Sequence, residues 1–247
     1  MHVSQKADAR VEIAFDELSA TYDQQFTDLP ANKALREKIG RTITARVTPG
    51  KLVLELGCGT GEDALFLAQH GVRVLGTDIS AGMIEQAKRK LAGLSAMVEL
   101  AVCEIAKLPE LLALSLAQRQ DTMPQTFDSI LANFGTLNCI PSLEPIRLLA
   151  EQRLAPDGYL FLCMINRFCM RELLRARFRR LRKSGAEAKC GARRIPIYYH
   201  APRRLRWPGF RVVEMLGLGV FSGQDVRRYP PFNRAGDHYL AVLQKSK

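Results

Sequence analysis

Short apolar runs alternate with amphipathic segments through the middle of the chain, between residues 51 and 165. Apolar runs of this length predict buried strands, and apolar positions three and four residues apart predict the helices that cover them. The expected strands are 51–56, 72–77, 97–103, 127–132 and 159–165, and the expected helices are 62–70, 80–92, 107–117 and 143–154. Strands that alternate with helices predict a parallel sheet with helices on both faces.

Both ends of the chain extend this pattern. Amphipathic helices are expected at 9–20 and 31–46, and two further strands at 210–216 and 238–244. The fold class is therefore α/β, with one mostly parallel sheet of seven strands. We expect a single domain over residues 1–247, made of a helical cap (1–48), a core (49–165), a lid or substrate region (166–209) and the last strands (210–247).

A glycine-rich loop follows the first expected strand of the core. Gly57, Gly59 and Gly61 alternate with other residues and precede a helix. Glycines let the backbone turn sharply and place no Cβ above the strand end, so a flat ligand can lie against the main chain. Asp78 follows the next strand, about 20 residues on, where nucleotide-binding folds place an acid for ribose hydroxyls. The pattern predicts a site for a nucleoside cofactor.

The spacing of this loop narrows the class of cofactor. It is Gly-x-Gly-x-Gly, whereas dinucleotide binders use Gly-x-Gly-x-x-Gly, and no Gly-Lys-Ser/Thr follows to hold a triphosphate. Glu55 lies two residues before the first glycine. A carboxylate there repels a pyrophosphate and suits a ligand with an ammonium or sulfonium charge.

Four segments together resemble the class I S-adenosylmethionine-dependent methyltransferases, of the small-molecule type similar to the ubiquinone/menaquinone methyltransferase-like group. They are Glu-Leu-Gly-Cys-Gly-Thr-Gly at 55–61, Asp-Ile-Ser at 78–80, Met83, and Phe-Asp at 127–128. The resemblance spans residues 51–164. It implies a Rossmann-like fold whose last strand inserts antiparallel, with S-adenosyl-L-methionine as cofactor.

The resemblance also implies roles for single residues. The three glycines approach the methionine portion and the adenosine, and Asp78 holds both ribose hydroxyls. The alternative for the glycines is a plain tight turn, and the alternative for Asp78 is a helix N-cap. The implied cofactor-binding set is Tyr22, Glu55, Gly57, Cys58, Gly59, Gly61, Asp78, Ile79, Met83, Glu104, Ile105 and Asn133.

Some members of this set have a specific expected contact. Met83 packs on the adenine face, or is simply core. Glu104 stands where related enzymes carry an aspartate near the adenine amino group, and Ile105 offers its backbone N–H to the ring. Tyr22 contacts the methionine carboxylate or lines the acceptor pocket. Alternatively, Tyr22 belongs to a buried helix face.

The segment Asn-Phe-Gly-Thr-Leu-Asn-Cys at 133–139 follows the fourth strand. It looks like a loop of some bacterial small-molecule methyltransferases, and it differs from the Asn/Asp-Pro-Pro-Tyr/Phe motif of enzymes that methylate amino groups of nucleic-acid bases or glutamine. The resemblance places Asn133 beneath the methionine and the transferable methyl. The alternative is a turn stabilised by its own amides.

Catalysis by such an enzyme demands little from its side chains. A sulfonium is already a good leaving group, so the enzyme mainly aligns the reactants and excludes water, and a general base is optional. The candidates for catalysis are Asn133, His200 in the lid region and His238 at the start of the last strand. A structural role is the alternative for both histidines.

The net charge of +11 is concentrated after the fifth strand. Met170, Leu174, Phe178 and Leu181 share one helical face there and predict a basic amphipathic helix within 167–183. Its cations are Arg167, Arg171, Arg175, Arg177, Arg179, Arg180, Arg182 and Lys183. The helix is interpreted as a lid over the acceptor or as a contact with anionic lipid. An anionic or amphiphilic small-molecule acceptor fits both interpretations. Nucleic-acid binding is disfavoured because few aromatic residues interleave the cations.

Other features exclude further classes. The six cysteines form no Cys-x-x-Cys pair and have no neighbouring histidines at metal-ligand spacing, so we expect small core residues in a reducing cytosol and no metal. No apolar run approaches the roughly 20 residues that cross a bilayer. The first eight residues lack the apolar core of a signal peptide, which favours a cytoplasmic location.

The leading hypothesis is an enzyme that transfers a methyl group from S-adenosylmethionine to oxygen, nitrogen or carbon of a small molecule. An RNA methyltransferase is the alternative among enzymes, and steep salt dependence of RNA binding distinguishes it. A non-catalytic cofactor-binding regulator is the alternative outside them.

Overall fold

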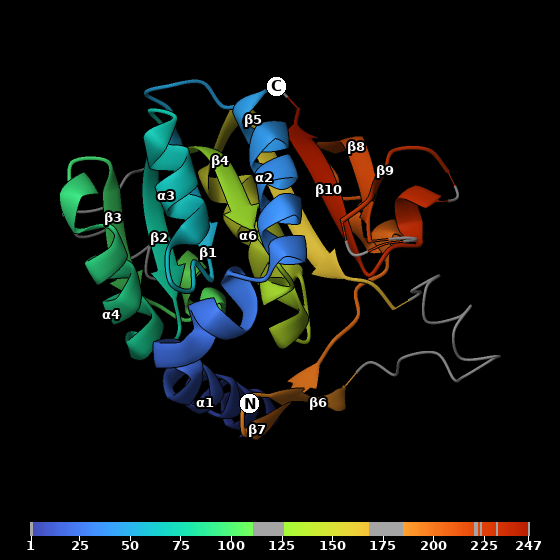
Figure 1. The fold of residues 1–247 in the computed structure, drawn as a ribbon. Helices are drawn as coiled ribbons and strands as arrows, with labels where there is room; N and C mark the ends of the chain where they lie inside the picture. The colour runs from blue at the N-terminus through green and yellow to red at the C-terminus, as the bar shows by residue number, and fades with distance from the viewer. Residues whose placement is uncertain are drawn as a thin grey trace.

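The computed structural model describes residues 2–110, 126–167, 185–219, 222, 224–230 and 232–246. Its centre is an eight-stranded sheet in the order β3-β2-β1-β4-β5-β10-β8-β9 (Figure 1). The strands are β1 (Leu52–Leu56), β2 (Arg73–Asp78), β3 (Val98–Val102), β4 (Phe127–Ala132), β5 (Leu154–Ile165), β8 (Phe210–Leu218), β9 (Val226–Arg227) and β10 (His238–Lys245).

The strand directions place the glycine-rich loop at the centre of the sheet. The first five strands in chain order are parallel, and β10 runs antiparallel to both β5 and β8. β1 pairs with β2 on one side and with β4 on the other, so the strand order reverses beside β1. Ligands of open α/β sheets bind at such a switch point, outside the carboxyl ends of the strands.

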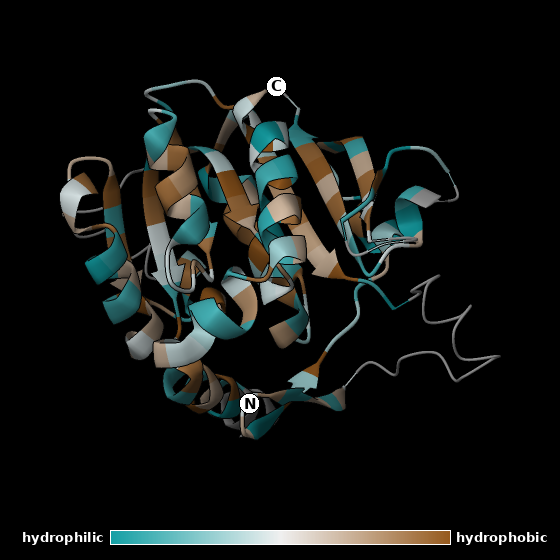
Figure 2. Ribbon diagram, in the orientation of Figure 1, coloured by the Kyte–Doolittle hydropathy of each residue, from teal (hydrophilic) through white to brown (hydrophobic). Residues whose placement is uncertain are grey.

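Helices cover both faces of this sheet. They are α1 (His2–Leu18), α2 (Pro30–Thr44), α3 (Glu62–Gln69), α4 (Ala81–Lys90) and α6 (Glu144–Arg153). Ile39 of α2 and Leu67 of α3 belong to one hydrophobic cluster, whereas Ile146 and Leu149 of α6 belong to the cluster on the other face. Figure 2 shows hydrophobic residues along the central strands and hydrophilic residues on outer helix turns.

All seven expected strands are present, and the expectation of seven strands is corrected to eight. The additional strand, β9, consists of only two residues at the edge of the sheet, too short to leave an apolar pattern. The helix expected at 107–117 is described only at 108–110, and the rest lies outside the described residues. No helix among the described residues has the length and apolar character to cross a membrane.

The region after the fifth strand is described only in part. The basic helix expected at 167–183 lies outside the described residues, apart from Arg167. The described remainder contains an antiparallel hairpin, β6 (Ala186–Cys190) and β7 (Arg193–Ile197), which forms a sheet of its own. The hairpin lies beside α1, beyond the carboxyl ends of the parallel strands (Figure 1).

Candidate active site

A cavity of about 390 Å³ opens at the carboxyl ends of β1, β2 and β4. It brings together residues that the sequence scatters over more than 200 positions. The expected site residues that line it are Tyr22, Gly57, Cys58, Gly59, Asp78, Ile79, Met83, Glu104, Ile105, Asn133 and His238. Glu55, Gly61 and His200 do not line it.

The three glycines of the loop have different surroundings. All three have positive φ, between +55° and +81°. A Cβ on Gly57 would meet Thr136 at 2.3 Å, and one on Gly61 would meet Leu91 at 2.8 Å. A Cβ on Gly59 would meet nothing within 4 Å, although this residue lines the cavity. Gly59 therefore leaves open space for a ligand, and Gly61 serves close packing of the loop against α4.

Asp78 lies at the end of β2 with its carboxylate held by two backbone groups. Its Oδ2 accepts from the Gly59 N–H at 2.9 Å, and its Oδ1 accepts from the Ser80 N–H at 2.9 Å. Burial raises the pKa of Asp78, and these backbone hydrogen bonds oppose the rise. Ser80 is the N-cap of α4, since its hydroxyl accepts from the Met83 N–H at 3.0 Å. Asp78 is thus not the cap itself.

Glu55 lies buried under the loop, with 1% of its surface exposed. Its Oε2 has no hydrogen-bond partner among the described residues. Burial raises the pKa of Glu55 well above its ordinary value, the nearby Asp63 raises it further, and Arg36 opposes both. The unpartnered Oε2 of Glu55 therefore supports the expected contact with a cationic ligand. Glu55 is nevertheless not among the residues that line the cavity.

An ion pair that the sequence analysis missed connects the cap to the core. The Arg36 guanidinium on α2 pairs with the Asp63 carboxylate on α3, and both line the cavity. The Asn133 side-chain amide donates to the same carboxylate at 3.0 Å, and the guanidinium carbon of Arg36 lies 4.4 Å from the centre of the Phe134 ring. The sequence carries no distinctive signal for this pair, because Asp63 lies 27 residues after Arg36 and neither residue belongs to a motif.

The turn after β4 uses its own amides. Asn133 Oδ1 accepts from the Phe134 N–H at 2.9 Å, and Phe134 has φ of 45°, uncommon for a residue with a side chain. Asn138 donates to the Tyr198 carbonyl at 2.7 Å and accepts from the Ile165 N–H at 2.8 Å. Asn138 therefore has the structural role expected of a turn that is stabilised by its own amides. Asn133 combines a structural role with a place in the cavity wall.

Aromatic residues of the cap cover the cavity. Tyr22 stacks on Phe26 with ring centres 5.2 Å apart and meets Phe15 edge-on at 6.4 Å. Burial raises the pKa of Tyr22 to about 12, so the phenol stays protonated at neutral pH. Tyr22 thus contributes to a packed face and to the cavity wall at once.

The residues expected beside adenine also line the cavity. Met83 is buried in α4 and still lines the cavity. Glu104 lines it too, with its carboxylate 2.6 Å from the Lys107 ammonium. Its neighbour Ile105 is also part of the lining.

The two candidate histidines have different positions. His200 is buried, and its Nε2 lies 2.9 Å from the Leu137 carbonyl and 3.2 Å from that of Ile140. Burial lowers the pKa of His200. Because this nitrogen already has main-chain partners and the residue lies outside the cavity, the structure does not place His200 at an acceptor. His238 lines the cavity, with its ring centre 6.0 Å from that of Phe134.

The cap is docked to the loop and to α4 by hydrogen bonds. Asp16 of α1 accepts from the Ser80 hydroxyl at 2.5 Å and from the Gly82 N–H at 2.9 Å. Asp23 accepts from the Thr60 hydroxyl at 2.6 Å and pairs with Lys90 at 2.8 Å. These contacts hold the cap against the glycine-rich loop and the start of α4. Within the described parts of the chain, no cluster of three or more histidine, cysteine or acidic residues has the arrangement of a metal site.

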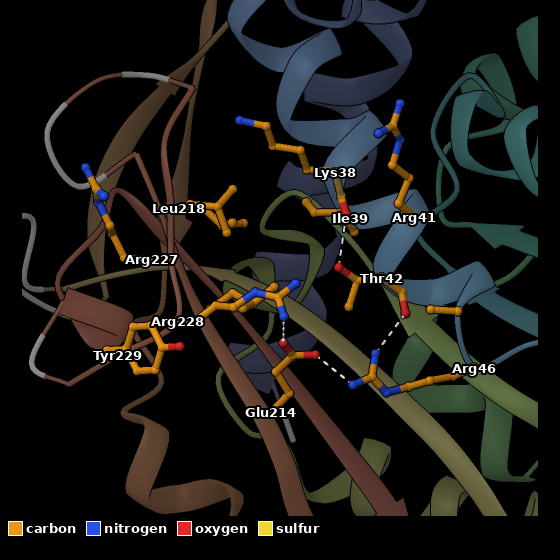
Figure 3. A pocket seen from close by; sticks show the side chains of 13 residues that line it. Lys38, Ile39, Arg41, Thr42, Arg46, Glu214, Leu218, Arg227, Arg228 and Tyr229 are labelled. Carbon is orange, nitrogen blue, oxygen red and sulfur yellow. Dashed lines mark hydrogen bonds and ion pairs between the residues drawn. The ribbon is translucent and has the colours of Figure 1, made fainter.

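A larger hollow of about 770 Å³ lies between α2 and the β8–β9 edge, away from the loop (Figure 3). Arg46 and Arg228 of its wall both pair with Glu214, at 2.8 and 3.4 Å, and Lys38 donates to the Gln224 carbonyl. None of the expected site residues lines it. The chemistry-bearing residues therefore gather in the smaller cavity.

Comparisons with known proteins agree with this fold. Residues 48–232 match the family described as "Methyltransferase domain". The chain is 29% identical over 160 residues to a demethylmenaquinone methyltransferase of Clavibacter sepedonicus, covering 64% of this chain and 59% of that protein.

Two solved structures share the fold over nearly the whole chain. The N-methyltransferase NodS of Bradyrhizobium japonicum, solved with S-adenosyl-L-homocysteine, has a TM-score of 0.61 at 16% identity and covers 96% of this chain and 100% of its own. The 1,6-didemethyltoxoflavin-N1-methyltransferase of Burkholderia thailandensis has a TM-score of 0.63 at 16% identity, with 100% and 92% covered.

Since the family match includes most of the chain, the protein belongs to the methyltransferase-domain family. The class I recognition and the Rossmann-like α/β fold class are thereby confirmed. The chain spans about 59% of the length of the curated relative it matches.

Proposed function

We propose that the protein is an S-adenosyl-L-methionine-dependent methyltransferase that acts on a small-molecule acceptor by in-line displacement. The observation that carries the proposal is the lining of one cavity. It combines Gly59, above which there is open space, the buried carboxyl group of Asp78 and apolar residues of the cap and hairpin. Membership of the methyltransferase-domain family supports the same reaction class.

The residues present fit the cofactor. The open space above Gly59 accepts a ligand against the main chain, and Asp78 has lone pairs left for two ribose hydroxyls. Two buried atoms near the loop, Glu55 Oε2 and Arg36 Nε, have no hydrogen-bond partner among the described residues. The Arg36 guanidinium suits the carboxylate of a methionine portion, and the ammonium of that portion would favour ionisation of the buried Glu55 carboxyl. The bound cofactor supplies a methyl group on a sulfonium, which is a good leaving group.

The chain's own residues then position the acceptor and exclude water. The acceptor atom forms its bond to the methyl carbon as the carbon–sulfur bond breaks, and any proton it loses passes to solvent or to a base. Asn133 and His238 are the proposed residues at this end, because both line the cavity. A cytoplasmic location is proposed with the enzyme, and the free thiols of Cys58, Cys139 and Cys163 support a reducing compartment.

Calorimetry with S-adenosylmethionine and S-adenosylhomocysteine tests the cofactor. Saturable binding is expected, and its absence from folded protein would contradict the proposal. Incubation with methyl-labelled cofactor and a metabolite extract of the host then tests transfer, with label expected in the small-molecule fraction. Label found only in RNA would favour the RNA methyltransferase, and binding without any transfer would favour the non-catalytic regulator.

A further inference from the structure

The cavity has a second part whose walls come from α1 and from the hairpin. We call this part the acceptor lobe. Its lining residues are Val11, Phe15, Leu18, Cys139, Ile140, Ala188, Cys190, Ile195 and Ile197. All of these side chains are apolar or thiols. Burial raises the pKa of Cys139 to about 12, and burial also raises the pKa of Cys190. Apart from Asp8 of α1 and Lys189 of β6, which also line the cavity, the two elements therefore present an uncharged surface to it at neutral pH.

The charges around the whole cavity do not favour an anion, although the chain carries +11. Five carboxylates and two cations line it: Asp8, Glu62, Asp63, Asp78, Glu104, Arg36 and Lys189. Arg36 is paired with Asp63, and Lys189 is exposed on β6. Glu62 and Glu104 are neutralised by lysines outside the cavity. Within the described residues, no buried cation of the lining is left to balance an anionic acceptor.

The walls of the lobe are fixed relative to each other. Arg10 of α1 pairs with Glu187 of β6 at 2.5 Å and donates to the Arg194 carbonyl at 2.8 Å. Glu17 of α1 pairs with Arg193 of β7. Asn138, through Tyr198, holds the end of the hairpin to the turn after β4. Because both walls are tied at several points, their side chains set the width of the lobe.

We propose that the acceptor is an uncharged, largely apolar molecule held between α1 and the hairpin, and that Phe15, Ala188 and Ile195 determine which acceptors fit. The inference rests on the proposed function, because it assigns the cofactor to the other part of the cavity. It replaces the sequence-based expectation of an anionic or amphiphilic acceptor with an uncharged, apolar one. Burial of apolar surface drives such binding, whereas an anion without a counter-ion pays the full cost of desolvation.

Two fluorescent probes that differ by one sulfonate test the proposal. N-phenyl-1-naphthylamine is uncharged, and 1-anilinonaphthalene-8-sulfonate is its sulfonated analogue. Each is titrated into the full chain saturated with S-adenosylhomocysteine, so that the cofactor part is already filled. The control is Ala92→Trp, an exposed residue outside the cavity, and the test variant is Ala188→Trp, which places an indole inside the lobe.

We expect the uncharged probe to bind saturably, and Ala188→Trp to remove the part of the binding that takes place in the lobe. For that part of the binding, the Kd of the uncharged probe should be at least tenfold below the Kd of the sulfonate. Ala188→Trp should raise the Kd of the uncharged probe at least tenfold and leave the Kd of S-adenosylhomocysteine within twofold of wild type. The control Ala92→Trp should leave both Kd values within twofold of wild type. Equal or tighter binding of the sulfonate, or no component sensitive to Ala188→Trp, would overturn the inference while the proposed function stands. Failure to bind S-adenosylhomocysteine would instead overturn the proposed function, and the inference with it.

Discussion

Asp78 and Gly59 are joined by a hydrogen bond of 2.9 Å, from the Gly59 N–H to Asp78 Oδ2. The bond connects the loop after β1 with the end of β2, so the two motifs that indicate a nucleoside site are oriented by each other. A carboxylate that already accepts from the backbone needs no rearrangement to accept ribose hydroxyls as well.

Asp78→Asn should weaken S-adenosylhomocysteine binding by about 1.5–3 kcal/mol, the scale of hydrogen bonds to a charged group. That corresponds to roughly a tenfold to 150-fold higher Kd in calorimetry. Asp28→Asn is the control, since Asp28 pairs only with the surface Lys33 in the described structure. An unchanged Kd in folded Asp78→Asn would remove the ribose assignment.

Gly59→Val and Gly61→Ala should fail in different ways. A valine at Gly59 enters empty space, so the fold should persist with a strain of about 1–3 kcal/mol while cofactor binding is lost. An alanine at Gly61 meets Leu91 and Ala87, so stability should fall further. Thermal melting and calorimetry separate the two effects. Wild-type affinity in Gly59→Val would show that the cofactor does not lie against the loop.

Arg36→Met should destabilise the fold by about 3–5 kcal/mol, because it leaves the Asp63 carboxylate buried and unpaired. The double variant Arg36→Met/Asp63→Leu should recover much of that loss, since no lone charge remains. Urea unfolding midpoints give the comparison. If the double variant is as unstable as the sum of the two single variants, the ion pair is not the source of the effect.

Glu55 should make stability depend on pH. Its pKa in the folded chain lies well above the ordinary value of 4.5, so the folded chain keeps a proton that the unfolded chain loses. The free energy of unfolding should therefore fall as pH rises above about 4.5, until the folded pKa is passed. Glu55→Gln removes this contribution, so its stability relative to wild type should increase between pH 5 and pH 8. A constant difference over that range would argue against a raised pKa.

The two histidines should separate function from stability. His238→Ala should lower kcat for the acceptor found in the extract assay and leave melting nearly unchanged, because the ring lines the cavity. His200→Ala should lower the melting temperature, since it removes a buried ring that bonds to the Leu137 carbonyl. The reverse pattern would return His200 to the list of catalytic candidates.

The cofactor end of the cavity followed from local signals. Glycine spacing, a buried strand before it and Asp78 about 20 residues later are all readable along the chain. Arg36 was missed because its partner Asp63 lies 27 residues away and neither residue belongs to a motif. A buried guanidinium next to Leu35 looks the same in sequence as a solvated one.

The hairpin had no local signal either. Alternating charges such as Glu187 and Lys189 mark it as an exposed segment, and its partners lie on α1, 177 residues earlier for the Arg10–Glu187 pair. Contacts at that separation leave no periodic pattern. The residues that line the acceptor lobe were therefore beyond prediction.

The two walls of the acceptor lobe come from α1 and from the hairpin after β5, whereas the loop and Asp78 come from the chain between them. α1 also lies before residue 48, where the family match begins. Mutations of the lining side chains in these two walls can thus change which acceptors fit while Gly59 and Asp78 stay in place, provided that Asp16 of α1 keeps its hydrogen bonds to Ser80 and Gly82. Because ion pairs tie α1 to the hairpin, the two elements form one unit for redesign of the acceptor lobe and are best exchanged together.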